Sequence, residues 1–224
     1  MTVAADGLIT ADPLEMMALA GHARRQLRWD PLMAARVVTT PRAVGVFTSP
    51  PMGVLAFMAV PVTSAPDEPV DTIVSLAALA ELAPLAAEEG LDVRGIPQAA
   101  VAPGSIPSVL HLPPEDGWQM PLHAVAGDLI PAVTEAVAEF AARTQGLSEH
   151  AQTSVAEEIW ARPAWGGLPM RVLHAAYRLG FIPQDRSRVS SAANGPWRRF
   201  TTVRGQVFSY DRGPAARLAL HLVK

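Results

Sequence analysis

Apolar residues recur with the 3.6-residue period of an α-helix between residues 128 and 142. The positions that point inward on this pattern are Ile130, Val133, Val137 and Phe140. Asp128 can accept hydrogen bonds from the first free amides, so we expect it to cap this helix. Two further helices are expected, one at residues 148–162 and one from Pro169 to Gly180, where glycine tolerates the left-handed conformation that ends many helices.

The N-terminal part predicts one helix followed by a small sheet. Asp12-Pro13-Leu14-Glu15 is typical of a helix start, which gives a helix at residues 13–28. Three β-branched or apolar runs follow, broken by prolines, as in a short antiparallel meander. They are residues 35–40, 43–48 and 54–61, with 70–74 as a candidate fourth strand. A short helix is expected after Ser75.

The C-terminal part alternates as strands do, at residues 188–192, 197–203, 206–212 and 216–223. The sequence Val203-Arg204-Gly205 contains one glycine, which favours a three-residue turn with a bulge. That turn would place Phe200 opposite Phe208. A two-residue turn would scatter the aromatic residues over both faces, so we expect the bulged register.

These elements together predict an α+β fold. We expect an N-terminal α+β lobe at residues 1–90 and a helical module with a C-terminal antiparallel sheet at residues 122–224. Residues 91–121 between them are rich in proline and lack periodicity, and they are therefore predicted to be a connection.

The charge of the chain is unevenly distributed. Residues 1–142 carry 6 basic and 16 acidic side chains, a balance of −10, and residues 143–224 carry 12 and 5, a balance of +7. Such a split points to a polyanionic partner, a self-complementary oligomer or two lobes that dock on each other. Only one of the 18 basic residues is a lysine, a bias more typical of GC-rich coding than of selection for anion binding.

The helix order followed by a hairpin in residues 128–212 resembles a winged helix. On this interpretation, the third helix would present Arg171, His174 and Arg178 to nucleic acid, and Arg204 would sit at the tip of the wing. The alternative is that these residues form the solvated face of an amphipathic helix. The helix offers no Asn or Gln for base edges, which favours that alternative.

No residue pattern in the chain predicts catalysis, a metal or a cofactor. The chain has no Cys, which excludes thiolate chemistry, and it has no nucleotide-binding or nucleophile-elbow motif. His111 and His123 flank an acidic loop, but loop histidines beside acids are usually solvated. We find no signal peptide, and the longest apolar run, residues 53–62, is too short to span a bilayer. We therefore expect a cytoplasmic protein.

Several short motifs resemble an uncharacterised protein type from high-GC Gram-positive bacteria. They are Ala43-Val44-Gly45-Val46-Phe47, Pro51-Met52-Gly53-Val54-Leu55-Ala56, Asp116-Gly117-Trp118, Leu179-Gly180-Phe181 and Trp197-Arg198-Arg199-Phe200. The resemblance implies an α+β fold and a cytoplasmic origin, and it brings no activity or functional residues.

From these observations we expect a non-catalytic soluble interaction module, with self-association as a homodimer or a protein partner. A winged-helix-like nucleic-acid-binding protein is the alternative, and an enzyme with a site between the two lobes comes third. We expect no membrane partner.

Overall fold

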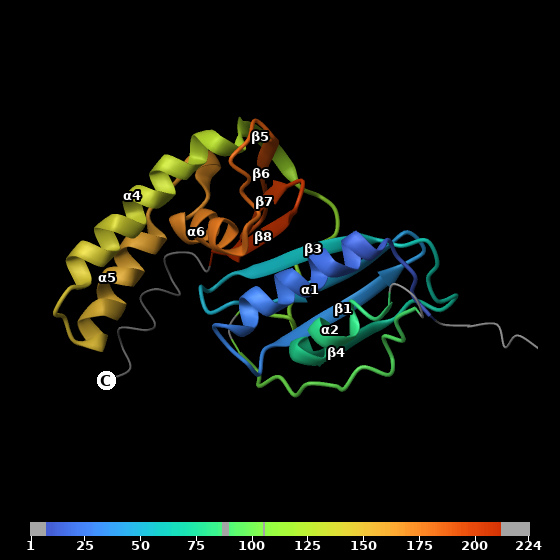
Figure 1. Cartoon of the computed structure of the whole chain (residues 1–224). Coiled ribbons are helices and arrows are strands. Elements are labelled where there is room, and N and C mark those ends of the chain that lie inside the picture. The colour runs from blue at the N-terminus through green and yellow to red at the C-terminus, as the bar shows by residue number, and fades with distance from the viewer. Residues whose placement is uncertain (1–7, 87–89, 105, 212–224) are drawn as a thin grey trace, which may run out of the picture. The chain divides into compact units, whose positions relative to one another are not determined.

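The computed structural model describes residues 8–86, 90–104 and 106–211, and it divides the chain into two compact units, residues 1–112 and 113–224. The elements of unit 1 are α1 (Pro13–Leu27), β1 (Ala34–Thr40), β2 (Ala43–Thr48), β3 (Leu55–Pro61), β4 (Asp71–Ser75) and α2 (Leu76–Leu82). All its strand pairs are antiparallel, in the order β4-β1-β2-β3. Helices α1 and α2 lie across one face of this sheet (Figure 1).

The core of unit 1 lies between this helix pair and the sheet. Asp12 accepts a hydrogen bond from the Leu14 amide at 2.8 Å, which confirms the predicted start of α1. The helix buries Met16 and Leu19 against apolar strand residues such as Val37 and Val46. The fully buried side chain of Gln26 links the layers, because it accepts a 2.8 Å hydrogen bond from the Thr48 hydroxyl of β2. A paired buried amide of this kind fixes one arrangement of helix and strand.

Unit 2 contains a second four-stranded antiparallel sheet, in the order β8-β7-β6-β5. Its elements are β5 (Gln119–Val125), α4 (Ala126–Thr144), α5 (Glu149–Ala161), the 3₁₀ turn η1 (Trp165–Gly167), α6 (Met170–Leu179), β6 (Arg188–Asn194), β7 (Trp197–Thr202) and β8 (Gly205–Tyr210). Gly180 ends α6 in the left-handed conformation, as predicted. The α+β fold class is therefore confirmed, while the predicted strand 216–223 lies outside the described residues.

The two units combine the same two parts in opposite order. One part is a strand that runs directly into a helix, β4 into α2 and β5 into α4. The other is a helix followed by a three-stranded meander, α1 before β1–β3 and α6 before β6–β8. In each unit the first strand of the meander pairs with the strand of the other part. The two sheets thus have equivalent strand orders although the chain enters them at different points.

The predicted register of the C-terminal hairpin is wrong. Phe200 pairs with Val207 and Arg199 with Phe208, around a two-residue turn at Val203 and Arg204. The Thr202 hydroxyl accepts a hydrogen bond from the Arg204 amide and donates one to the Gly205 carbonyl, which holds the turn without a bulge. The aromatic residues consequently lie on both faces of the sheet.

Two other local predictions need correction. The helix that Asp128 was expected to cap begins three residues earlier, with Val125 at its cap and no side-chain cap bond, so Asp128 lies in the first turn. Strand β5 was not predicted, because its Pro121 and the prolines before it resemble a loop.

The Pro-rich stretch 91–121, which was predicted to be a connection, contributes to both units. Leu91 and Ile96 are in the core of unit 1, and Trp118 packs within unit 2.

Two adjacent glycines in η1 give a matched test of packing on the helix-covered face of unit 2. Gly166 and Gly167 both have positive φ, but only a Cβ at Gly166 would lie 2.8 Å from the Ser191 Cβ. We expect Gly167→Ala to lower the free energy of unfolding by about 1–2 kcal/mol from backbone strain alone. Gly166→Ala should cost about 1–3 kcal/mol more. Urea unfolding measures both, and equal losses would show that Ser191 does not constrain this turn.

Candidate nucleic-acid interface

Helix α6, which the winged-helix alternative would place against nucleic acid, packs its Arg171 and His174 against α5. The His174 ring stacks on Trp160 with ring centroids 4.1 Å apart and an interplanar angle of 6°. Arg171 Nε donates to the Trp160 carbonyl at 3.4 Å. Burial, together with the charge of Arg178, lowers the pKa of His174 to about 4, so it is neutral at pH 7. Neither residue presents a free cationic face to a phosphate.

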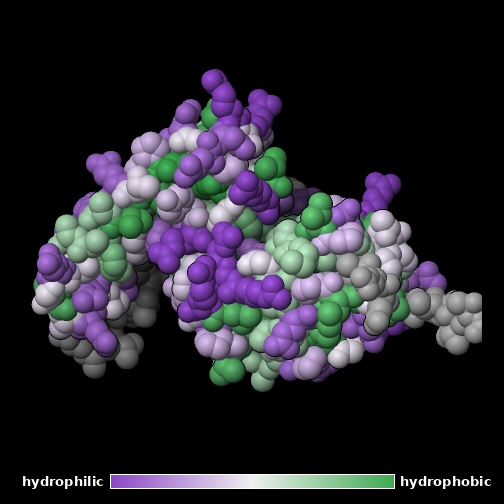
Figure 2. Space-filling view, viewed as in Figure 1, coloured by the Kyte–Doolittle hydropathy of each residue, from purple (hydrophilic) through white to green (hydrophobic). Residues whose placement is uncertain are grey.

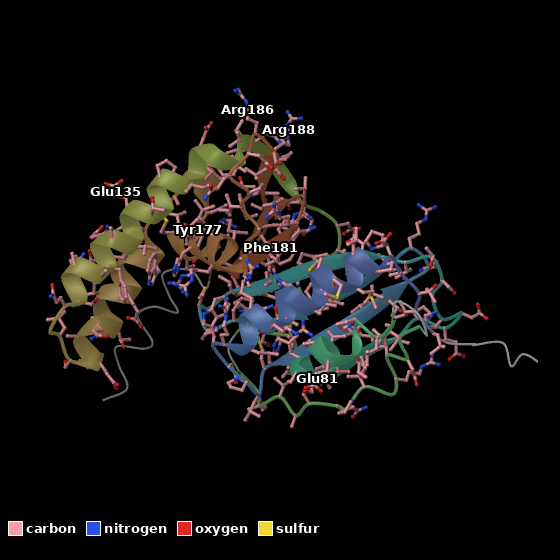
Figure 3. All side chains as sticks on the ribbon, viewed as in Figure 1. Glu81, Glu135, Tyr177, Phe181, Arg186 and Arg188 are labelled. Carbon is pink, nitrogen blue, oxygen red and sulfur yellow. The ribbon has the colours of Figure 1, made fainter. Side chains whose placement is uncertain are left out.

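Four exposed arginines gather where α6 ends and the sheet of unit 2 begins. They are Arg178, Arg186, Arg188 and Arg204, and we call them the arginine end. Arg204 Nη1 donates to the Gly180 carbonyl at 3.2 Å, which joins the hairpin turn to the end of α6. Arg186, in the segment between α6 and β6, and Arg188, the first residue of β6, project outward together (Figure 3), where hydrophilic side chains crowd the surface (Figure 2).

The carboxylate of Asp185 lies close enough to Arg204 to feel its charge and is next in sequence to Arg186. Hydrogen bonds from Ser187 lower its pKa, and the positive charge of Arg204 adds to the effect. Asp185 Oδ1 accepts from the Ser187 amide at 2.7 Å, so this carboxylate also holds the loop that carries Arg186 and Arg188. Counted together with Asp185, the four arginines of the arginine end have a net charge of +3.

Other basic residues of unit 2 are neutralised by ion pairs between α4 and α5. Arg143 pairs with Glu139 at 2.9 Å and Glu158 at 2.5 Å, and Arg162 pairs with the same carboxylates at 2.5 and 2.7 Å. Hydrogen bonds from the two arginines lower the pKa of both glutamates to about 2.

The charge of the chain can also be counted by unit. Unit 1 carries 6 basic and 11 acidic residues, a net charge of −5, and unit 2 carries 12 basic and 10 acidic residues, a net charge of +2. The charge split is thus smaller than the halves suggested.

The sheet of unit 2 has one face toward the helices and one face away from them. Phe200 marks the first, since its ring lies 6.4 Å from Trp165 of η1, and Ser191 beside it donates to the Gly166 carbonyl. The alternate residues form the other face, which we call the strand face. The strand face includes Arg188, Ser190, Trp197, Arg199, Thr201, Gln206, Phe208 and Tyr210.

An arginine and several aromatic rings meet on the strand face. The guanidinium carbon of Arg199 lies 4.3 Å from the centroid of Trp118, and Trp118 lies 5.8 Å from Phe208. Trp197 and Tyr210 meet edge to face at 5.2 Å. The Arg199 Nε is buried with no hydrogen-bond partner within the described ranges. Burial lowers the pKa of Arg199, which nevertheless stays cationic at pH 7.

The structure thus separates the four residues predicted from the sequence. Arg178 and Arg204 belong to the arginine end, whereas Arg171 and His174 pack on α5. Sequence reasoning missed Arg186 and Arg188, although they flank the start of a predicted strand that follows a glycine-ended helix. It also missed the cluster around Arg199, because that cluster depends on the hairpin register.

His111 and His123, which flank the acidic loop of the sequence, lie in different units. His111 is in unit 1, where its Nδ1 lies 3.2 Å from the Ser108 hydroxyl, and His123 is on β5 of unit 2. Over the part of the chain that the structure describes, no three His, Asp or Glu side chains are grouped closely enough to hold a metal ion. No helix in the described ranges has the length and apolar character needed to cross a bilayer.

Two family models match the sequence, one in each unit. Residues 3–103 match a domain of unknown function, DUF8010, and residues 113–214 match another, DUF8185. No curated protein matches the chain.

Solved structures of bacterial sliding clamps have a similar fold. DNA polymerase III subunit beta from Borrelia burgdorferi has a TM-score of 0.53 at 5% identity and aligns with 94% of this chain and 67% of its own. A DNA polymerase sliding clamp from Caulobacter crescentus has 0.52 at 11% identity, over 98% and 69%. A candidate DNA polymerase III beta subunit from Eubacterium rectale has 0.53 at 8% identity, over 91% and 63%. This chain therefore spans about two thirds of the length of these proteins.

The likeness corrects the functional expectations drawn from the sequence. A fold shared with sliding clamps over more than nine tenths of the chain replaces the interaction module of unknown function. It also replaces the winged helix, because β5 precedes the three helices and the supposed wing is half of a four-stranded sheet.

The neutral state of His174 gives a test by pH. The unfolded chain takes up a proton on this imidazole below about pH 6.5, whereas the folded chain does so only near pH 4. Stability is therefore lost as the pH falls from about 6.5 to about 4. We expect His174→Phe, which keeps a ring on Trp160, to reduce this loss by roughly 1–2 kcal/mol, allowing for partial exposure.

His22, whose pKa burial also lowers to about 4, contributes a pH dependence of the same sign in that variant. Unfolding at a series of pH values and the NMR titration of the His174 ring measure the effect. A His174 pKa near 6.5 would contradict the packing described.

Proposed function

We propose that this chain is a clamp-type protein that self-associates and holds duplex DNA. The observation that carries the proposal is the fold, which resembles sliding clamps through both units at TM-scores of 0.52 and 0.53. Those proteins are named as clamps that serve a DNA polymerase. From the sliding clamps we take only the class of partner, DNA, and the way a clamp holds it, by enclosing it.

The arginine end supports duplex DNA as the partner. Four exposed guanidinium groups on neighbouring segments can each approach a backbone phosphate, and arginine suits phosphate because its fork of donors matches the oxygens. Such contacts do not depend on the base sequence. A protein that holds DNA without choosing a sequence needs contacts of this kind.

The edge of the unit 2 sheet supports self-association. Strand β5 is the last strand in the order β8-β7-β6-β5, and its pairing partner is β6. The Ala126 amide bonds to the Ser187 carbonyl, so in an antiparallel ladder the backbone groups of His123 and Val125 point to the other side. An open strand edge is a template for another strand. Pro121 and the register shift before Leu122 limit that template to its second half.

Duplex binding is predicted to be salt-dependent and to need the arginine end. If all four arginines contact phosphates, the logarithm of affinity should fall against the logarithm of salt with a slope of about −3.6. Arg186→Glu with Arg188→Glu should weaken binding and reduce the slope by about 2. Fluorescence anisotropy with a labelled duplex between about 50 and 200 mM salt measures both.

The matched control for this experiment changes charge equally in unit 1. Arg42→Glu with Arg94→Glu alters two exposed arginines there and lowers the net charge by the same amount. We expect the control to keep most of the slope. If the two double variants lose affinity equally, only the overall charge matters, and the arginine end is not the contact.

Self-association should depend on the outward backbone groups of β5. We expect the mass from light scattering to rise with protein concentration. His123→Pro removes one outward amide while leaving the bonds to β6, so it should lower the apparent association constant about tenfold or more. The control is His123→Thr, which keeps the amide and suits a strand. A chain that stays monomeric at every concentration would contradict this part of the proposal.

A further inference from the structure

The strand face of unit 2 carries a cationic and aromatic cluster that the proposed duplex contact does not use. The cluster consists of Trp118, Trp197, Arg199, Phe208 and Tyr210. Trp197 and Phe208 are buried and form its floor, whereas Trp118, Arg199 and Tyr210 are half-buried and reach the surface. All five belong to unit 2, on the side of the sheet away from Trp165 and η1.

Arg199 is the unusual member of this cluster. Its guanidinium stacks over the Trp118 ring at 4.3 Å, and its buried Nε lacks a hydrogen-bond partner within the described ranges. The six ion pairs found among the described residues do not include Arg199. Its neighbour Arg198, on the opposite face, donates to the carbonyls of Gly195 and Trp197 at 2.8 and 3.0 Å. A stacked cation without a counter-charge leaves its outer donors available to an anion.

The surroundings of Arg199 indicate which anion fits. The aromatic rings at the surface offer flat apolar area, which a free phosphate or a lone carboxylate would not use. The strand face also presents the hydroxyls of Ser190 and Thr201 and the amide of Gln206. A ligand with flat rings spaced along a phosphate backbone would use both kinds of group.

We propose that the strand face of unit 2 binds single-stranded DNA, with Arg199 donating to a phosphate and an unpaired base stacking against Trp118 or Tyr210. Duplex DNA fits less well, because its bases are stacked inside the helix and cannot reach aromatic side chains on a flat sheet. The inference rests on the proposed function for the class of partner, DNA. It assigns a different surface and a different form of that partner.

The test compares Arg199 with Arg198 in the full-length chain. A labelled oligothymidylate of about 12 nucleotides is titrated and followed by anisotropy and by quenching of tryptophan fluorescence. We expect Arg199→Lys, which keeps the charge but loses the stacked fork, to weaken binding about fivefold or more. Arg198→Lys, the same change on the helix-covered face, should alter affinity less than about twofold.

Trp118→Phe is the second variant and addresses stacking without any change of charge. It should weaken oligothymidylate binding about fivefold and remove part of the quenching, while duplex affinity stays at the wild-type value. Thermal unfolding of each variant shows whether the fold is retained. The Trp118 and Arg199 variants test the site through different groups, so a folding defect in one leaves the other as the test.

The outcomes separate this inference from the proposed function. Duplex binding that depends on Arg186 and Arg188, with oligothymidylate binding indifferent to Arg199 and Trp118, would overturn only the inference. Equal losses for both forms of DNA in Arg199→Lys would also overturn it, because Arg199 would then be a general phosphate contact. A chain that binds neither form would overturn both proposals. Selective loss of single-strand binding in both variants would support the site.

Discussion

The two-residue turn at Val203 and Arg204 sets the pairing of the C-terminal hairpin, and the chemistry of unit 2 depends on that pairing. Because side chains alternate along a strand, a shift by one residue would exchange the two faces of β8 relative to β7. With the observed register, Phe208 lies beside Arg199 on the strand face while Val207 packs beside Phe200 under the helices. The hydrogen bonds of the Thr202 hydroxyl stabilise the turn from which this register follows.

The same turn connects the two surfaces that carry positive charge. Arg204 is one of its two residues, and its bond to the Gly180 carbonyl joins the hairpin to the end of α6. Asp185 and Ser187 then shape the segment that presents Arg186 and Arg188. Away from this end, Glu139 and Glu158 satisfy Arg143 and Arg162. The arginines of unit 2 therefore serve different purposes, and their number alone would not locate a nucleic-acid interface.

Local signals in the sequence were sufficient for most elements and insufficient for the site. Asp12 and Pro13 identify the start of α1, and Gly180 identifies the end of α6, because cap chemistry is local. The hairpin register depends on packing against both sheet faces, which Gly205 alone does not reveal. Strand β5 was missed since Pro121 is tolerated only at a sheet edge, and an edge is a property of the whole sheet. The Arg199 cluster could not be predicted for both reasons. Trp118 directly precedes the missed strand β5, and the position of Phe208 depends on the hairpin register.

The charge of the chain bears on how a clamp of this kind would hold DNA. With a net charge of −3 and an arginine end of only +3, each copy has a small electrostatic attraction for a polyanion at physiological salt. Affinity of that size would not retain DNA by itself. Association of several copies multiplies weak contacts, and enclosure prevents escape even when each contact opens. Weak contacts also let a protein move along the duplex, whereas tight ones would fix it in place. Among the described residues, β5 pairs only with β6. On the proposed function, the few exposed arginines of unit 2 and this unpaired edge are therefore complementary, because association compensates for weak DNA contacts.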